Sequence, residues 1–142
     1  MHRGEITIRV RYAETDRMGF LHHANYLVYF EQGRTELLRS HGLTYKDLED
    51  KGYLLVLAKL EVRYRSPARY DDLLTLETTT VRTTAVRIDH RYRLMRDGVL
   101  LAEGSSTLAC VDRDGRLQML PDCLIDRKLG KRSSESESTS AD

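Results

Sequence analysis

The chain has 142 residues, which is enough for one domain with a hydrophobic core and too few for two domains of ordinary size. Its 32% charged and 40% hydrophobic residues are typical of a soluble globular protein, and a net charge of +1 gives no reason to expect a nucleic-acid partner. No apolar run approaches the ~20 residues of a membrane span, and residues 1–5 lack the apolar stretch of a signal peptide. We therefore expect a cytoplasmic protein with no membrane span.

The first third of the chain reads as a strand followed by helices. Residues 5–12 alternate apolar and polar side chains, as a half-buried strand does, and a loop follows at residues 13–22. From residue 23 or 24 to about residue 41, apolar side chains recur at helical spacing. Gly33 lies inside this helix, where it would let a sheet pack close to the backbone. Thr44 is placed to cap a short second helix that extends to residue 50.

The rest of the chain is rich in strand patterns. Four segments have the composition or alternation of strands, and they cover residues 54–64, 73–81, 86–94 and 99–111. Asp97-Gly98 is a strong hairpin signal between the last two segments, and a further short segment follows at residues 117–120. One helix can cover only one face of such a sheet, so the sequence predicts an α+β fold, although periodicity alone permits several folds of that class. Residues 131–142 are rich in Ser and Glu and predict a disordered tail.

Metal chemistry has little support in the sequence. Cys110 and Cys123 form no CxxC motif and have no histidines at metal-ligand spacing around them. His22 and His23 are chain neighbours, so their side chains do not converge on one ion, and no third ligand is evident. We therefore expect no metal site.

The loop and the helix start between residues 12 and 26 carry the residues that indicate a reaction. Asp16 lies in a glycine-containing loop, and His23 follows seven residues later where the helix begins. A helix start exposes unpaired backbone N–H groups and the positive end of the helix dipole. A carboxylate aimed at that point makes a nucleophile or a base beside an oxyanion site. Taken alone, Asp16 would more often be a residue that closes an ordinary loop, and His23 a polar residue at a helix start.

The spacing Tyr-x-x-Thr-Asp-x-x-Gly-x-x-x-His-x-x-Tyr resembles the signature of the 4-hydroxybenzoyl-CoA thioesterase-like family of hotdog-fold proteins. The similarity is greatest to the Tol-Pal-associated acyl-CoA thioesterase subgroup. The resemblance implies a hotdog domain at residues 1–130, in which an antiparallel sheet wraps around one long central helix. It also implies hydrolysis of an acyl-CoA thioester to a free acid and CoA, without a metal or a redox cofactor.

The resemblance also implies roles for residues of the motif. Asp16 would attack the thioester carbonyl or activate the water that does, and the backbone N–H of His23 would stabilise the developing oxyanion. A supporting set would hold the loop against the helix and line the acyl pocket, and its members are Tyr12, Gly19, Asn25 and Tyr26. Further along the helix, Glu31 and Arg34 stand three residues apart, and we expect them to form an ion pair.

Oligomerisation is a further implication, because relatives pair two sheets edge to edge with their active sites at the subunit boundary. We expect a homodimer or a dimer of dimers (a homotetramer), with residues 66–68, including Pro67, close to the Asp16 loop of a partner. The family often has an arginine-rich turn where this chain has Thr83-Thr84-Ala85, so the resemblance does not locate a phosphate grip. Arg82 and Arg87 are the substitutes that we predict to bind the CoA phosphates.

Two alternatives stay open. The first has the same chemistry and acts on acyl groups carried by acyl carrier protein. The second is a non-catalytic hotdog protein that binds acyl thioesters or serves as an assembly partner. Asp16 argues against the second alternative, because a protein that only binds has no need of a carboxylate facing a helix terminus.

Overall fold

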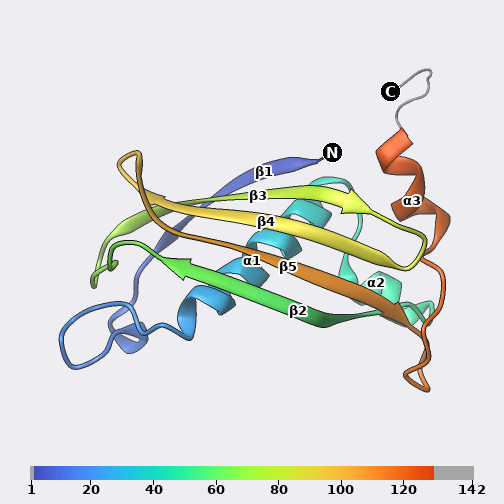
Figure 1. The fold of residues 1–142 in the computed structure, drawn as a ribbon, viewed down its shortest axis with the longest axis horizontal. Helices are drawn as coiled ribbons and strands as arrows, with labels where there is room; N and C mark the ends of the chain where they lie inside the picture. The colour runs from blue at the N-terminus through green and yellow to red at the C-terminus, as the bar shows by residue number, and fades with distance from the viewer. Residues whose placement is uncertain (1, 130–142) are drawn as a thin grey trace.

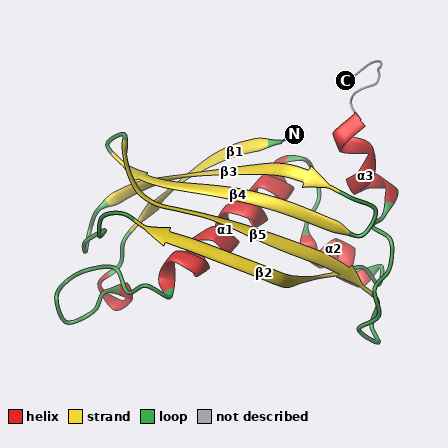
Figure 2. Cartoon of the chain, in the orientation of Figure 1, coloured by secondary structure: helices red, strands yellow, loops and turns green. Residues whose placement is uncertain are grey.

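A computed structural model describes residues 2–129 of the chain. The elements, in chain order, are β1 (Arg3–Arg9), a 3₁₀ turn (Tyr12–Glu14), α1 (Asn25–Ser40), α2 (Tyr45–Asp50), β2 (Leu54–Tyr64), β3 (Leu73–Thr83), β4 (Arg87–Arg96), β5 (Val99–Val111) and α3 (Asp122–Leu129). Figure 1 and Figure 2 show how these elements are arranged. The tail predicted for residues 131–142, and with it the predicted domain end at residue 130, lies outside the described residues.

The strands form one antiparallel sheet in the order β1-β3-β4-β5-β2. In its register Ile8 lies opposite Leu74 and Tyr92 lies opposite Gly104. Helix α1 runs across one face of this sheet, and the strands curve around it (Figure 1). This confirms the predicted α+β arrangement of an antiparallel sheet around one long helix. Within residues 2–129, no helix is long and apolar enough to span a membrane.

Two glycines allow the helix and the sheet to approach closely. A Cβ atom added to Gly33 would lie 2.4 Å from Oγ1 of Thr78, and one added to Gly104 would lie 2.6 Å from Cε2 of Phe30. Neither distance leaves room for a side chain, so both positions need glycine for packing. The expectation for Gly33 is therefore confirmed.

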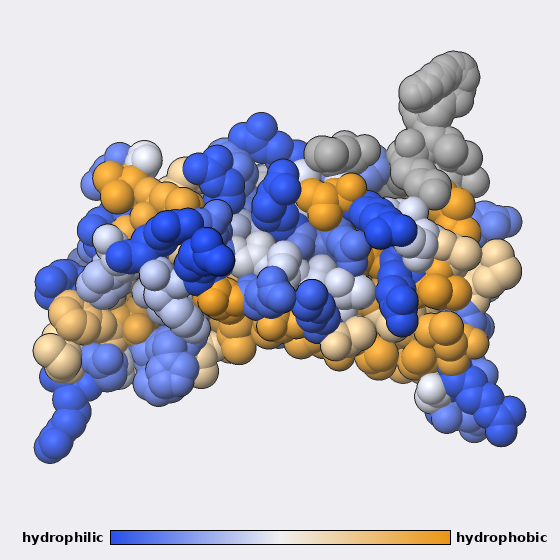
Figure 3. All heavy atoms as spheres, in the orientation of Figure 1, coloured by the Kyte–Doolittle hydropathy of each residue, from blue (hydrophilic) through white to orange (hydrophobic). Residues whose placement is uncertain are grey.

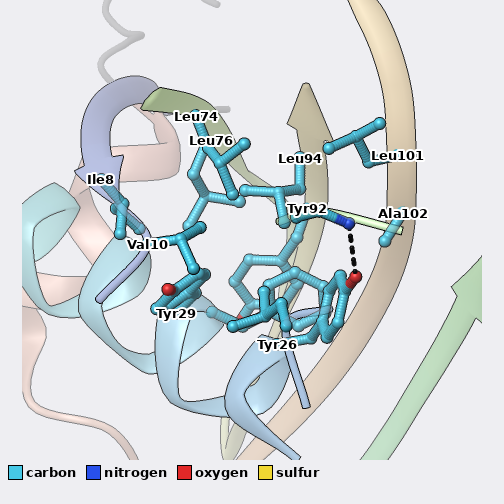
Figure 4. Packing of buried hydrophobic residues seen from close by; sticks show 13 residues of the cluster. Ile8, Val10, Tyr26, Tyr29, Leu74, Leu76, Tyr92, Leu94, Leu101 and Ala102 are labelled. Atoms are coloured by element: carbon cyan, nitrogen blue, oxygen red, sulfur yellow. Dashed lines mark hydrogen bonds between the residues drawn. The ribbon is translucent and has the colours of Figure 1, made fainter. Parts of the chain in front are cut away.

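The core lies between α1 and the covered face of the sheet. Tyr29, Phe30 and Tyr92 have no exposed surface, and the rings of Phe30 and Tyr92 stack with their centroids 4.4 Å apart. Leu74 and Leu76 of β3 and Leu94 of β4, labelled in Figure 4, belong to the same buried cluster as these rings. Each fully buried side chain of this size stabilises the fold by about 1.5–3 kcal/mol, so α1 is held mainly by this apolar face.

The face of the sheet away from α1 is polar. Along β4 the exposed side chains alternate with buried ones, and Arg87, Arg91 and Arg93 point away from the helix. Figure 3 shows hydrophilic side chains across this face, and hydrophobic ones along the lower edge, where β2 lies. Val56 and Leu57 of β2 are large apolar residues with 44% and 47% of their surface exposed. The edge strand β2 therefore exposes large apolar side chains in its first half, although its second half exposes the charged Lys59, Glu61 and Arg63.

Three details differ from the sequence prediction. The first strand ends at Arg9 and not at residue 12, because the backbone of Val10 pairs with residues 71 and 72 and the chain then turns into the 3₁₀ segment. Helix α3 was not predicted. The expected ion pair of Glu31 with Arg34 is absent, since Nη1 of Arg34 donates to the Tyr92 hydroxyl at 3.4 Å instead.

Candidate functional site

The Asp16 loop is closed by its own hydrogen bonds. The backbone N–H of Asp16 donates to the carbonyl of Phe20 at 2.8 Å, and Gly19 donates to the carbonyl of Asp16 at 3.0 Å. Gly19 has a φ of 81°, which glycine adopts without strain, so this position serves the turn. The loop therefore presents the Asp16 side chain from a fixed backbone.

The two oxygens of the Asp16 carboxylate have different surroundings. Oδ1 accepts the backbone N–H groups of Met18 at 2.9 Å and Phe20 at 3.1 Å. Oδ2 accepts no hydrogen bond from any residue between 2 and 129. The loop-closing reading of Asp16 is thus correct for one oxygen, while the other is available to a water molecule or a substrate. Because Oδ1 fixes the side chain, Oδ2 is held in a defined direction.

The chain that enters α1 leaves the backbone N–H of His23 without an acceptor among the described residues. The N–H of His22 donates to the carbonyl of Glu14 at 2.9 Å, and the N–H of Ala24 donates to Nδ1 of His22 at 3.2 Å. The N–H of Asn25 donates to the carbonyl of His22 at 2.9 Å. Between these bonded groups, the N–H of His23 donates to no acceptor in the described part of the chain. It lies at the positive end of the helix dipole, where an anion is stabilised.

Asp16 and His23 line the same cleft, which has a volume of about 290 Å³. Its other lining residues come from the loop, from α1 and from the end of β2, namely Phe20, Leu21, Tyr26, Tyr64, Arg65, Ser66 and Pro67. The hydroxyl of Tyr64 donates to the carbonyl of His23 at 3.0 Å, and its ring packs edge-on against Tyr26. Burial raises the pKa of the Tyr64 phenol, so the phenol stays protonated and keeps this bond at neutral pH.

The segment after β2 packs on the Asp16 loop of its own chain. Phe20 and Arg69 form an isolated antiparallel bridge, and the N–H of Leu21 donates to the carbonyl of Ala68 at 2.8 Å. The N–H of Ala68 in turn approaches the Tyr26 hydroxyl at 3.4 Å, the dashed line in Figure 4. Pro67 therefore lines the cleft of its own chain, and the approach of residues 66–68 to the Asp16 loop of a partner stays a prediction.

Glu14 supports this site, although no sequence motif indicated it. It is a buried carboxylate with 6% of its surface exposed. Its Oε1 accepts the backbone N–H of Arg11 at 2.8 Å and the hydroxyl of Tyr29 at 2.7 Å, and its Oε2 accepts the Arg11 guanidinium at 3.2 Å. Burial alone would raise the pKa of Glu14, but these hydrogen bonds outweigh it and hold the pKa below its ordinary value.

The backbone of Glu14 completes the same connection. Its carbonyl accepts the N–H of His22 and the side-chain amide of Asn25, both at 2.9 Å. Glu14 therefore ties the beginning of the Asp16 loop to the start and the second turn of α1. A charged residue in a loop is usually exposed, so the only sequence signal was its spacing of three residues from Arg11.

Of the other predicted site residues, some line or support the cleft and one lies away from it. Asn25 supports the loop through Glu14, and Tyr26 lies in the core with 3% exposure while it also lines the cleft. Tyr12 does not line the cleft, because its ring is 77% exposed and packs edge-on against Tyr70. The motif thus contributes cleft residues, loop supports and one surface residue.

Arg82 and Arg87 lie at the far end of the sheet from this cleft. The turn that joins β3 to β4 is at the right of Figure 1, whereas the Asp16 loop is at the left. Arg82 lines a second cavity at that end, and Arg87 is exposed. Their predicted contact with the CoA phosphates stays a prediction. Within residues 2–129, no group of three or more His, Cys, Asp or Glu side chains is arranged to hold a metal ion.

Comparison with known proteins places the chain among thioesterases. The family described as the Thioesterase-like superfamily matches residues 10–136. The chain is 38% identical over 106 residues to the acyl-CoA thioesterase YbgC of Haemophilus influenzae, covering 74% of this chain and 78% of that protein. It is 36% identical over 107 residues to the acyl-CoA thioester hydrolase YbgC of Escherichia coli, covering 74% and 79%. The structure also superposes on DHNA-CoA thioesterase of Staphylococcus aureus with a TM-score of 0.86 and 25% identity, covering 99% of each chain.

Proposed function

Because the chain belongs to the Thioesterase-like superfamily and has its hotdog fold, we propose that it hydrolyses acyl-CoA thioesters to a free acid and CoA. The observation that carries the proposal is that one cleft contains both a free hydrogen-bond acceptor and a free hydrogen-bond donor. Oδ2 of Asp16 is an acceptor without a donor, and the N–H of His23 is a donor without an acceptor, among the described residues. Acyl transfer needs such a pair, one group to deliver the nucleophile and one to stabilise the oxyanion.

In this proposal the thioester carbonyl oxygen points at the His23 N–H. Either a water molecule attacks the carbonyl carbon and passes a proton to Oδ2 of Asp16, or Oδ2 attacks directly and forms an anhydride that water then opens. In both routes negative charge develops on the carbonyl oxygen at the helix start. When that oxygen re-forms its double bond to carbon, the C–S bond breaks. The CoA sulfur leaves as a thiolate and takes up a proton.

The role of the His23 backbone is tested by two variants at one position. His23→Ala keeps the N–H and should reduce turnover only modestly. His23→Pro removes the N–H, and loss of one such donor costs about 3–4 kcal/mol of barrier, so we expect turnover to fall by at least 100-fold. His23 precedes the N-cap residue Ala24, and its N–H makes no hydrogen bond with a described residue, so proline breaks no such bond there and the fold should survive. Equal turnover in the two variants would exclude this backbone donor, and an inactive alanine variant would assign the role to the imidazole.

The substrate class is tested by measuring thiol release from short, long and aromatic acyl-CoA esters, and from the same acyl groups on acyl carrier protein. Turnover of the CoA esters is the expected result. Turnover restricted to the carrier-protein esters would support the acyl-carrier-protein alternative. Saturable binding of acyl-CoA without thiol release would support the non-catalytic alternative.

We also infer that the active unit is a homodimer that pairs through β2. This strand is an edge of the sheet, it is 11 residues long, and it exposes Val56 and Leu57. A long edge strand with exposed apolar side chains pairs readily with another chain, and Figure 3 shows a band of hydrophobic side chains along the lower edge, where β2 lies. A second copy paired there would extend the sheet and cover the band. A dimer of dimers and a cytoplasmic location stay predictions.

A further inference from the structure

A second cavity lies between the C-terminal half of α1 and the ends of β3 and β4. Its volume is about 300 Å³, and α2 and α3 contribute Tyr45 and Leu124 to its wall. The catalytic cleft lies at the other end of α1. From Tyr26 in the cleft to Leu38 in the cavity the helix rises by about 18 Å, so one small ligand cannot occupy both places in one chain.

The cavity has an apolar body. Its apolar lining comes from Leu37 and Leu38 of α1, Leu55 of β2 and Ile88 of β4. Its volume is about twice that of an engineered cavity of about 150 Å³ that binds benzene, so it has room for an acyl chain or an aromatic ring of about ten heavy atoms. A space of this size is larger than the voids that ordinary packing leaves in a protein interior.

The acidic and basic side chains that line the cavity, among the described residues, are two arginines, and the other polar lining residues are histidines, threonines and a tyrosine. Arg34 is half-buried, and its only hydrogen bond with a described residue goes to the neutral hydroxyl of Tyr92, at 3.4 Å. Arg82, near the end of β3, also lines the cavity. Neither arginine forms an ion pair with a residue in the range 2–125, where the structure describes the side chains, and no aspartate or glutamate of that range lines the cavity. A half-buried guanidinium without a counter-ion is unfavourable unless an anion joins it.

His90 gives an independent indication of a ligand. The residue is 4% exposed and lines the cavity, and its Nδ1 atom has no hydrogen-bond partner among residues 2–129. A buried polar atom without a partner costs free energy that a ligand can recover. Burial, and then the charge of Arg34, lowers the pKa of His90 to about 4, so the ring is neutral at physiological pH. A neutral imidazole offers one N–H donor and one acceptor nitrogen.

We propose that this cavity is a second ligand site, which binds a small monocarboxylic acid with an aliphatic or aromatic body. The carboxylate pairs with Arg34 and Arg82 and reaches the imidazole of His90, and the apolar part packs between Leu37, Leu38 and Ile88. The proposal does not depend on thioester hydrolysis, because none of these residues lines the catalytic cleft.

The test uses octanoate as the probe and the full-length protein, with calorimetry for affinity and the ¹⁵N signals of the His90 ring for location. Octanoate should bind with one site per chain and shift the His90 signals in step with saturation. A hydrogen bond to a charged partner is worth about 1.5–3 kcal/mol, so Arg34→Gln should weaken binding at least tenfold. Arg82→Gln, at an exposed position, should weaken it by a smaller factor of about three.

Three controls show whether the ligand occupies this cavity and whether its charge matters. Arg91→Gln makes the same chemical change on the polar face of the sheet, away from the cavity, and should leave binding unchanged. Octanol should bind at least tenfold more weakly than octanoate, because it lacks the charge. Ser66→Trp obstructs the catalytic cleft and should leave octanoate binding intact.

Several results would overturn the proposal. These are an absence of saturable binding in the millimolar range, equal affinity for octanol, or equal losses in the Arg34 and Arg91 variants. Loss of octanoate binding in Ser66→Trp alone would place the ligand in the catalytic cleft. Because Arg82 is exposed, its variant tests the charge requirement even if Arg34→Gln fails to fold.

Discussion

Replacing Glu14 by glutamine tests whether this buried carboxylate holds the Asp16 loop on α1. The native carboxylate accepts three hydrogen bonds, two of them from Arg11 and one from Tyr29. Glutamine has one acceptor oxygen, and its NH₂ group meets a donor where Oε2 was, so at least one bond is lost and the others are no longer made to a charge. The Arg11 side chain is 74% exposed, so its ion pair with Glu14 adds little. We expect a loss of about 2 kcal/mol in the free energy of unfolding.

The assay is urea unfolding at neutral pH. Glu31→Gln makes the same chemical change at an exposed position of α1 and serves as the control. The control should stay within about 0.5 kcal/mol of the wild type. Turnover of Glu14→Gln should fall by about tenfold or more, because the loop that carries Asp16 is loosened. A Glu14 variant as stable and as active as the control would refute the reasoning.

The pH dependence gives a second check on the same variant. The pKa of folded Glu14 lies below its ordinary value of 4.5, so the unfolded chain binds the proton more tightly. Its contribution to stability is therefore present above pH 4.5 and is lost as the pH falls through the lower, folded value. The difference in stability between the wild type and Glu14→Gln should shrink in that acid range. A difference that grows as the pH falls would contradict the assignment.

Three further predictions concern the rest of the fold. Gly33→Ala should destabilise the protein by about 1–3 kcal/mol in urea unfolding, because its Cβ would meet Thr78 at 2.4 Å. The folded pKa of His90, about 4 against 6.5, means that unfolding takes up a proton between these values, so stability falls as the pH falls. From pH 7.5 to 5 the free energy of unfolding should fall by about 2 kcal/mol through His90 alone. His90→Asn should remove this part of the measured pH dependence. Leu57→Lys on the β2 edge should yield monomers in light scattering, whereas Leu117→Lys, also exposed but off this edge, should not.

The sequence predicted the fold well where one local signal dominated. Alternation located β2 with its ends, the Asp97-Gly98 turn located the β4–β5 hairpin, and Thr44 does accept the N–H of Asp47 at the start of α2. Arg9 ends β1 earlier than the alternation suggested, because the pairing of Val10 with the segment before β3 depends on contacts distant in sequence. Periodicity alone does not contain such contacts.

The sequence predicted the two central residues of the candidate site but not the residues that hold them in place. Asp16 and His23 line one cleft, as the helix-start argument required, while Tyr64 and Arg65 enter it from a strand about forty residues later. Glu14 escaped notice because only the folded structure shows that it is buried and bonded to Tyr29. Spacing along the chain identifies groups on one loop, but it does not show which distant segment completes the site.

Thiol release by Asp16→Asn is the most direct measurement of the central claim. Asparagine keeps Oδ1 as the acceptor for Met18 and Phe20, so the loop should stay closed while the charge and the second carboxylate oxygen are lost. We predict a folded variant with unchanged acyl-CoA binding and turnover lowered by at least ~100-fold, the scale of positioned acid–base or nucleophilic help. A folded Asp16→Asn variant that hydrolyses acyl-CoA at nearly the wild-type rate would contradict the account.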